Sequence, residues 1–144
     1  MRMSLIVAII LFIGSEQSAT IKVNSNDTIQ GAIDKAREGD LIEVQSGTYY
    51  ENIDVNKRID LKGIGNPIVD AGKKGNGITI SANGIVLEGF TIVNAEDSGI
   101  NVISNNNNTI KANIVSGNRL CGVNLYNCSN NTLSNNIPNI TNLV

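Results

Sequence analysis

This chain has neither histidine nor tryptophan, and no acidic residue follows Asp97. Without histidine, and with only two cysteines, it is short of the side chains that most often bind transition metals. Aromatic residues make up 3% of the chain, so an apolar core must consist mainly of Ile, Val and Leu. Because no Asp or Glu side chain follows Asp97, the C-terminal third cannot supply a carboxylic general acid, a nucleophilic carboxylate or carboxylate ligands for Ca²⁺.

Charge clusters and long apolar runs are also scarce. The net charge is −2, and the basic residues cluster only at 57–58 and 73–74, which argues against a nucleic-acid partner. The longest apolar run, residues 5–13, is far below the roughly 20 residues that span a bilayer. The composition therefore predicts one domain with no nucleic-acid partner and no integral membrane span after signal cleavage.

The N-terminus resembles a secretory signal. Arg2 gives a positive start, residues 5–13 form an apolar segment, and Ser18 and Ala19 are small residues suited to cleavage. We predict that residues 1–19 are a signal peptide and that the mature protein is secreted or lies on the cell surface. The cleavage point stays open because Gln17 is a poor residue for it, and the alternative is an uncleaved anchor.

A repeat of about 23 residues runs through the second half of the chain. Gly-Ile-Thr-Ile at 77–80 returns as Gly-Ile-Asn-Val at 99–102 and as Gly-Val-Asn-Leu at 122–125. A second block keeps the same step, because Asn-Asn-Thr-Ile at 107–110 returns as Asn-Asn-Thr-Leu at 130–133. Two landmarks with one period of this size predict one coil of a solenoid per repeat.

Ahead of the repeats, one segment starting at Ile29 has apolar residues at helical spacing. Asp27 and Gln30 form a capping-box pattern at its start, and Gly39 follows its end. We predict an amphipathic helix over 28–38. Such a helix would cover the strand edges and apolar side chains that the first coil of a solenoid exposes.

The remaining segments alternate apolar and polar residues between turns, as short strands do. The predicted fold is therefore all-β: a right-handed parallel β-helix over residues 20–144, with three strands in each coil of about 22–23 residues. The alternation places Ile100, Ile110 and Val123 in the core. Asn101 falls on the opposite face of its strand, where a change to Asp should be mild.

The C-terminal sequence from Ile137 to Val144 is apolar and stops in mid-repeat. We see no second capping helix there. The expectations are a truncated member of a longer solenoid family, or another β-helix subunit that covers an open C-terminal end.

Asparagine is concentrated near the C-terminus, with 15 in the 42 residues from Asn101 to Asn142. The 23-residue step would place like residues above one another, which predicts structural ladders of stacked asparagine side chains. Their members are Asn108 over Asn131 and Asn113 over Asn136. The alternative is an amide-lined groove that binds sugar hydroxyls.

Five Asn-x-Ser/Thr sequons are candidate N-glycosylation sites. They begin at Asn26, Asn107, Asn127, Asn130 and Asn139. We expect Asn26, beside the helix cap, to be the most exposed. Sequons in the ladder turns should be less available if their amides stack.

The two cysteines, Cys121 and Cys128, fall along one predicted strand. An extended segment of that length spans on the order of 20 Å, beyond disulfide reach. We interpret them as unpaired, half-buried or buried core thiols. Their redox state stays open, because a sharp bend would bring them together.

The cap pattern and the segments Ile-Glu-Val at 42–44, Gly-Thr-Tyr at 47–49 and Leu-Glu-Gly-Phe-Thr-Ile at 87–92 resemble the pectin-lyase-like superfamily of parallel β-helix proteins. The Asn-Asn-Thr-Ile/Leu blocks are similar to NosD-type repeats, which are abundant in surface proteins of methanogenic archaea. The resemblance covers residues 21–137 and implies the fold. It leaves activity open, since the superfamily contains lyases, hydrolases, epimerases and non-catalytic proteins.

Enzymes of this superfamily act on acidic polysaccharides with clustered carboxylates, often with Ca²⁺ and a basic residue. The weak candidates here are Asp70, Glu96 and Asp97, with Lys62 as a base. The plainer interpretation is that these are outward-facing solubilising charges. Copper delivery, associated with the NosD name, is poorly supported by a chain without histidine.

The sequence thus predicts a secreted or cell-surface, non-catalytic β-helix module, structural or associated with surface glycans, that needs no cofactor. The alternatives are a carbohydrate-active enzyme or its remnant, with Ca²⁺ required only in that case, and a NosD-type copper-accessory protein.

Overall fold

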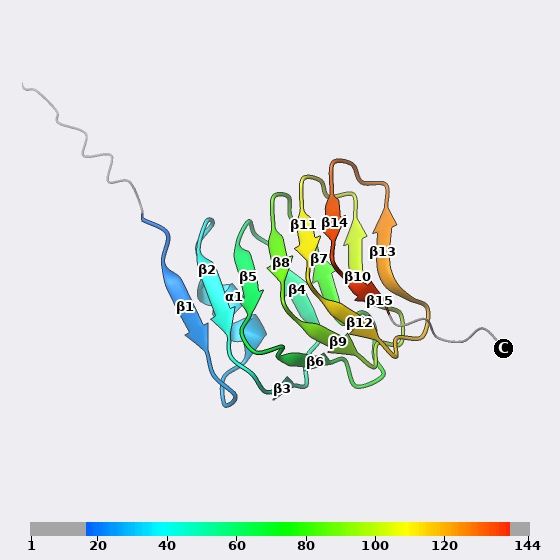
Figure 1. The fold of residues 1–144 in the computed structure, drawn as a ribbon. Helices are drawn as coiled ribbons and strands as arrows, with labels where there is room; N and C mark the ends of the chain where they lie inside the picture. Colours follow the sequence, from blue (N-terminus) through cyan, green and yellow to red (C-terminus); the bar gives the residue numbers. More distant parts are fainter. Residues whose placement is uncertain (1–16, 139–144) are drawn as a thin grey trace, which may run out of the picture.

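The chain winds into an all-β parallel solenoid of about five turns, which confirms the predicted fold class. The computed structural model describes residues 17–138. Successive coils stack along one axis, from β1 at the N-terminal end to β13, β14 and β15 at the other (Figure 1). The predicted signal peptide therefore lies almost wholly outside the described residues. Within residues 17–138, no helix is long and apolar enough to cross a membrane.

Three parallel sheets form the walls of the solenoid. The six-stranded sheet contains β1 (Thr20–Val23), β2 (Leu41–Val44), β5 (Asp60–Gly63), β8 (Val86–Glu88), β11 (Thr109–Lys111) and β14 (Thr132–Ser134). The five-stranded sheet contains β3 (Thr48–Tyr49), β6 (Ile68–Asp70), β9 (Thr91–Val93), β12 (Ile114–Ser116) and β15 (Ile137–Pro138). The four-stranded sheet contains β4 (Ile53–Val55), β7 (Ile78–Ile80), β10 (Ser98–Ile103) and β13 (Cys121–Tyr126).

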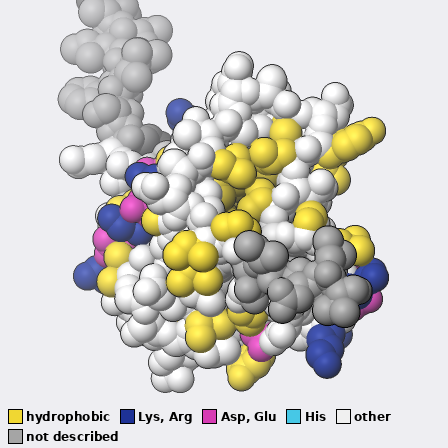
Figure 2. Space-filling view, turned by 45° about the vertical axis from the view of Figure 1, so that its right-hand side comes forward, with side chains coloured by type: hydrophobic (Ala, Val, Ile, Leu, Met, Phe, Trp, Pro, Cys, Tyr) yellow, Lys and Arg dark blue, Asp and Glu magenta, His cyan; other side chains and the backbone are white. Residues whose placement is uncertain are grey.

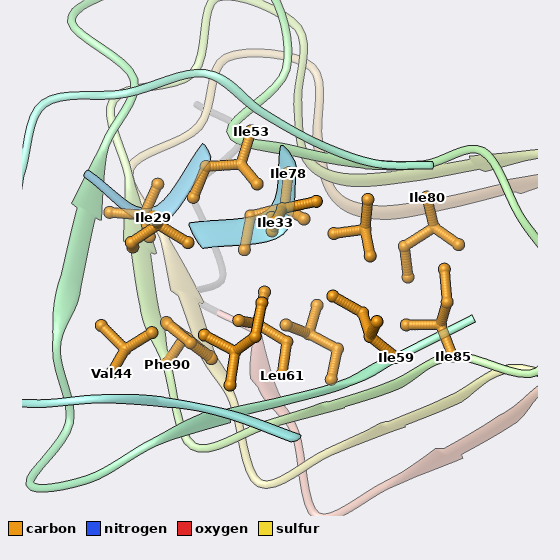
Figure 3. Close-up of a cluster of buried hydrophobic side chains, with 14 of the residues drawn as sticks. Ile29, Ile33, Val44, Ile53, Ile59, Leu61, Ile78, Ile80, Ile85 and Phe90 are labelled. Carbon is orange, nitrogen blue, oxygen red and sulfur yellow. The ribbon is translucent and has the colours of Figure 1, made fainter. Parts of the chain in front are cut away.

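The core is a stack of aliphatic rows, because parallel pairing in register places like residues above one another. Ile42, Leu61, Leu87 and Ile110 form one such row in the six-stranded sheet, and each is fully buried. Figure 3 shows side chains from several coils filling the interior together. Burial of apolar surface contributes about 25 cal/mol per Å², so these rows are the main stabilising element.

The predicted inward residues lie where the periodicity places them. Ile100 and Ile110 are fully buried, and Val123 is partly buried against the core. Asn101 lies on the opposite face of its strand from Ile100, as predicted, but it is only 7% exposed. It is paired between Thr79 and Asn124 of the adjacent strands, and Asn124 Nδ2 donates to its Oδ1 at 2.7 Å. Neighbouring side chains on the outer face, rather than the core, exclude water from it.

The helix α1 (Ile29–Lys35) is shorter than the predicted segment 28–38. Ala36 already has extended backbone angles, with φ −66° and ψ 152°, so the residues after it form a turn into β2. Ile29, Ala32 and Ile33 are buried. The helix contacts β1, β2 and β4, and so it covers the first coils as predicted.

The predicted capping box is also wrong. The N-cap is Thr28, whose Oγ1 accepts a hydrogen bond from the Gly31 N–H at 3.2 Å. The next coil supplies a second cap, because the Glu51 carboxylate accepts the N–H groups of Ile29 and Gln30 at 2.8 and 2.9 Å. A carboxylate at a helix N-terminus satisfies free donors and is favoured by the helix dipole. A partner 21 or 22 residues away could not be found from a local motif.

The C-terminal end of the described structure is open and apolar. Leu133 continues the buried row of Ile110 but is 43% exposed, and Leu125 and Ile137 are 40% and 61% exposed. A hollow of about 410 Å³ at this end is lined by Val115, Val123, Leu133 and Pro138, among others. Figure 2, which brings this end forward, shows hydrophobic side chains gathered there.

Candidate functional site

The corners of the coils repeat one local structure. At the corners of the coils that contain β8, β11 and β14, a residue in the left-handed region precedes a residue that turns into the solenoid. In one coil, the left-handed residues are Asn107 (φ 60°), Ala112 (φ 53°) and Gly117 (φ 64°). Gly and Asn adopt this region readily, which explains why the turns are rich in both.

The residues after these positions are asparagines whose side chains bridge adjacent coils. Asn113 is fully buried; its Oδ1 accepts the N–H of Phe90 at 3.0 Å, and its Nδ2 donates to the Leu87 carbonyl at 3.1 Å. Asn108 and Asn118 accept the N–H groups of the residues 23 positions earlier in the same way, both at 2.8 Å. We call Asn108, Asn113, Asn118, Asn131 and Asn136 the clamp asparagines.

The predicted pairs are stacked, but their main contacts differ from a simple ladder of amides. The N–H of Asn108 donates to Asn131 Oδ1 at 2.9 Å, and the N–H of Asn113 donates to Asn136 Oδ1 at 3.1 Å. One contact joins two side chains, from Asn113 Nδ2 to Asn136 Oδ1 at 3.1 Å. Each amide thus mainly satisfies backbone groups that the corner would otherwise bury unpaired.

Sequence reasoning missed Asn118, which occupies the third corner and is 5% exposed. Its Nδ2 donates to the Ile92 carbonyl at 3.2 Å, as the Nδ2 of Asn113 does to the Leu87 carbonyl. The position 23 residues later is Thr141, so no repeated asparagine pointed to it. The five-residue spacing of Asn108, Asn113 and Asn118 was the available signal. Because Asn108, Asn113 and Asn118 are buried, these three amides do not line a sugar-binding groove.

Asp70 and Glu96, two of the predicted catalytic candidates, are both held in contacts near one turn. Asp70 Oδ1 accepts the N–H of Gly72 at 2.9 Å, and its Oδ2 accepts from Asn94 Nδ2 at 3.0 Å. Glu96 Oε1 lies 2.8 Å from Arg119 Nε, and this side-chain pair is about half exposed. Such contacts shape the turn and join successive coils.

Asp97 follows Glu96 and is half-buried. Its backbone N–H donates to the Gly75 carbonyl at 2.9 Å, and its carbonyl accepts the N–H of Leu120 at 3.0 Å. Near these residues, a shallow hollow of about 330 Å³ is lined by Lys73, Glu96 and Arg119, among others. The described residues contain no group of three or more His, Cys, Asp or Glu arranged to hold a metal ion.

Lys62, the proposed base, lies on a different wall from these carboxylates. It belongs to β5 of the six-stranded sheet, in an outer row of alternating charge. In register, the row reads Lys22, Glu43, Lys62, Glu88 and Lys111. Lys111 Nζ is 3.3 Å from Glu88 Oε2. Opposite charges on neighbouring strands favour this register, and Lys62 lies within that row.

Two of the three tyrosines are exposed, in separate parts of the solenoid. Tyr49 is 3% exposed, and its hydroxyl donates to the Gln45 carbonyl at 2.9 Å. Burial is the main cause of a raised Tyr49 pKa, and the charges of Asp27 and Glu51 add to it. Tyr50, which follows β3, is 78% exposed, and Tyr126, the last residue of β13, is 67% exposed.

Both cysteines are free and half-buried, as predicted, but Cys128 lies after the end of β13 rather than on the same strand as Cys121. Cys121 Sγ lies 3.1 Å from Ser98 Oγ of the preceding coil, and Cys128 packs against the core.

The sequon asparagines Asn26, Asn107, Asn127 and Asn130 are all exposed, while Asn139 lies outside the described residues. The clamps use the second asparagine of each Asn-Asn-Thr block, not the sequon asparagine. The expectation that clamping would make Asn107 and Asn130 less available was therefore wrong.

Comparison with known proteins identifies a family and a relative. The profile of the family described as "Periplasmic copper-binding protein (NosD)" matches residues 8–142. A cell surface glycoprotein of Methanothermus fervidus is 36% identical over 124 residues, covering 78% of this chain and 21% of the relative. This chain thus spans about a fifth of that relative's length. No solved structure gives a significant match.

Copper, named in that family description, does not fit the side chains of this protein. Copper sites in proteins use imidazole, thiolate and thioether ligands. The chain has no histidine, and its methionines, Met1 and Met3, lie outside the described residues. Cys121 contacts a serine hydroxyl, Cys128 packs in the core, and neither belongs to a metal-binding cluster of described residues.

Proposed function

The chain belongs to the NosD family of parallel β-helix proteins, and on that basis we propose that it is a non-catalytic structural module displayed on the cell surface. The cell-surface glycoprotein of Methanothermus fervidus supports the location. The secretory-signal pattern of residues 1–19 supports it independently.

The observation that carries the non-catalytic assignment is the use of the candidate side chains as contacts within and between coils. Asp70 bonds to Asn94, Glu96 pairs with Arg119, and Lys62 lies between Glu43 and Glu88 on another sheet. General acid–base chemistry needs groups within hydrogen-bond reach of one reacting site. Charges spread over two walls and paired along the stack are better suited to fixing the register of a rigid rod.

The activity test is incubation of the secreted protein with polygalacturonate and alginate, with and without Ca²⁺. We expect no unsaturated or reducing ends above the level of a denatured sample. Matched variants Asp70→Asn and Glu96→Gln should behave like the wild type. Turnover that either variant abolishes would contradict the assignment and favour a carbohydrate-active enzyme.

The surface test is labelling of intact native cells with a membrane-impermeant amine reagent. The exposed Lys73 and Lys74 are suitable targets. We expect labelling of intact cells to equal that of lysed cells. Labelling only after lysis would contradict display at the surface.

The partner in this proposal is a further β-helix coil with asparagines at its corners. Within residues 17–138, nothing accepts the N–H groups of Asn131 and Asn136, whereas clamp amides accept the corresponding groups of Asn108 and Asn113. The adjacent face is apolar, and residues 120–138 carry no charge that would oppose stacking. A coil with amides at five-residue spacing would satisfy both donors and cover Leu133.

This partner is tested by replacing residues 137–144 with a second copy of residues 114–136, whose copies of Asn131 and Asn136 place asparagines at the two corner positions one 23-residue step beyond the originals. We expect a higher melting temperature than that of the wild type. The matched control has alanine at the two corner positions of the added coil and should gain much less. Equal gains would show that amide recognition does not govern stacking.

A further inference from the structure

We propose that N-linked glycan is carried by one column on the solenoid, formed by Asn107 and Asn130, and that the column holds one glycan at a time. This inference rests on the proposed surface display, because N-glycosylation takes place on exported chains. It assigns the modification to one edge, between the four-stranded and six-stranded sheets.

The two asparagines lie in equivalent turns of successive coils. Asn107 lies between β10 and β11, and Asn130 lies between β13 and β14. Both turns are at the top of the view in Figure 1. The coils are joined there by the N–H of Asn107, which donates to the Ser129 carbonyl at 3.3 Å.

The local geometry presents both amides to solvent. Asn107 and Asn130 have φ angles of 60° and 56°, and both residues are exposed. Within the described chain, neither side-chain amide has a hydrogen-bond partner. The following residues, Asn108 and Asn131, turn inward and make the clamps.

Asn127 and Asn26 differ from this column. Asn127 Nδ2 donates to Ser104 Oγ at 3.2 Å, so its amide is already engaged. The sequon of Asn26 ends at Thr28, whose hydroxyl caps α1. Among the four described sequons, Asn107 and Asn130 therefore combine exposure, an unengaged amide and a hydroxyl residue outside any cap.

The spacing of the column limits its occupancy. Neighbouring parallel strands are about 4.8 Å apart, and the coils of Asn107 and Asn130 follow one another at this step. An N-linked glycan is bulky, so the first glycan obstructs transfer to the second amide. The Asn-Asn-Thr repeat thus supplies two alternative acceptors for one glycan.

The preceding coil offers a conservative variant. Gly84 occupies the equivalent corner with φ 70°, so Asn107→Gly and Asn130→Gly remove the sequons while keeping the backbone conformation. Ala112→Gly is the matched control, since it makes a similar change at a left-handed position (φ 53°) outside any sequon.

The experiment expresses the full chain in a secretory host with an active oligosaccharyltransferase, with a flexible sequon peptide appended as an internal acceptor. Site occupancy is measured by mass spectrometry of intact protein and of peptides. We expect one glycan at the column, divided between Asn107 and Asn130. Asn107→Gly should shift it entirely to Asn130, the double variant should lose it, and Ala112→Gly should change nothing.

Full simultaneous occupancy of both asparagines would overturn the one-glycan column. An unmodified column in a protein whose appended acceptor is modified would overturn the column itself. Neither result bears on surface display, which the labelling of intact cells tests separately.

Discussion

Two neighbouring coils have the same corner backbone but opposite corner chemistry. The coil of β8 and β9 has Ile85, Phe90 and Ala95 at its corners, whereas the next coil has Asn108, Asn113 and Asn118. All six are buried. A residue at a buried corner must fill the interior with its side chain, and its backbone N–H must have a hydrogen-bond acceptor. Apolar corner residues fill the interior, and the asparagine amides of the next coil accept their N–H groups. The stability of a corner therefore depends on two coils.

The largest expected effect is the difference in unfolding free energy between the variants Asn113→Ala and Asn136→Ala. The first change leaves the Phe90 N–H and the Leu87 carbonyl without their Asn113 partners in the interior. Each unpaired buried group costs about 1–3 kcal/mol, so we expect a loss of about 3–5 kcal/mol of unfolding free energy. Asn136 is half-buried in the last described coil, so the Asn136→Ala change should lower the unfolding free energy by only about 1–2 kcal/mol.

Urea denaturation followed by circular dichroism gives both values. Asn113→Leu is a useful control, because it restores apolar volume without the hydrogen bonds and should remain strongly destabilised. A leucine variant as stable as the wild type would mean that volume alone stabilises this corner.

A smaller difference in stability is expected between truncations of two leucines that belong to one core row but lie in different coils. Leu87 and Leu133 belong to the same inward row, but Leu87 is fully buried and Leu133 is 43% exposed. Truncation of a buried leucine costs about 2–5 kcal/mol, so Leu87→Ala should fall in this range. Leu133→Ala should cost about 1 kcal/mol or less, because much of its surface already meets solvent. Equal losses in denaturation would show that the C-terminal end is covered in solution.

The smallest effect is a pH dependence at the N-terminal end. The N–H groups of Arg37 and Ala19 donate to the Asp40 carboxylate at 2.8 and 2.7 Å, and they lower its pKa below the usual 3.8. A pKa lower in the folded chain means that ionised Asp40 favours folding. This contribution is present above the unfolded pKa and is lost as the pH falls through the lowered folded value.

Asp40→Asn should therefore flatten the loss of stability below about pH 4, measured by thermal unfolding across the acid range. Cleavage of the chain after Ala19 would remove one of the two donors and weaken the effect. An unchanged acid profile in Asp40→Asn would show that this carboxylate is not linked to folding.

Much of the fold was predictable because its causes repeat along the chain. The 23-residue step and the alternation of apolar residues fixed the coil and the inward orientation of Ile100 and Ile110. Features that depend on contacts across coils were not predictable from local patterns. The cap from Glu51 and the burial of Asn101 arise from residues more than 20 positions away.

The candidate site shows the same limit. The Asn-Asn-Thr blocks predicted stacked asparagines, but composition could not tell which asparagine turns inward. The left-handed conformation of Asn107 and Asn130 decides this, since it leaves the sequon amide outside and directs the next residue into the core. Residue type alone pointed to the charged candidates. The amino-acid sequence did not reveal that Lys62 and Asp70 lie on different sheets.

Clamp amides accept the corner N–H groups of the coil before them, and so they should protect these groups from exchange with water. The direct measurement is residue-resolved hydrogen exchange by NMR. We expect slow exchange at Phe90 and Asn113, whose N–H groups donate to clamp amides, and fast exchange at Asn136, whose N–H has no acceptor within residues 17–138. Slow exchange at Asn136 equal to that at Asn113, in a monomeric sample, would contradict the claim.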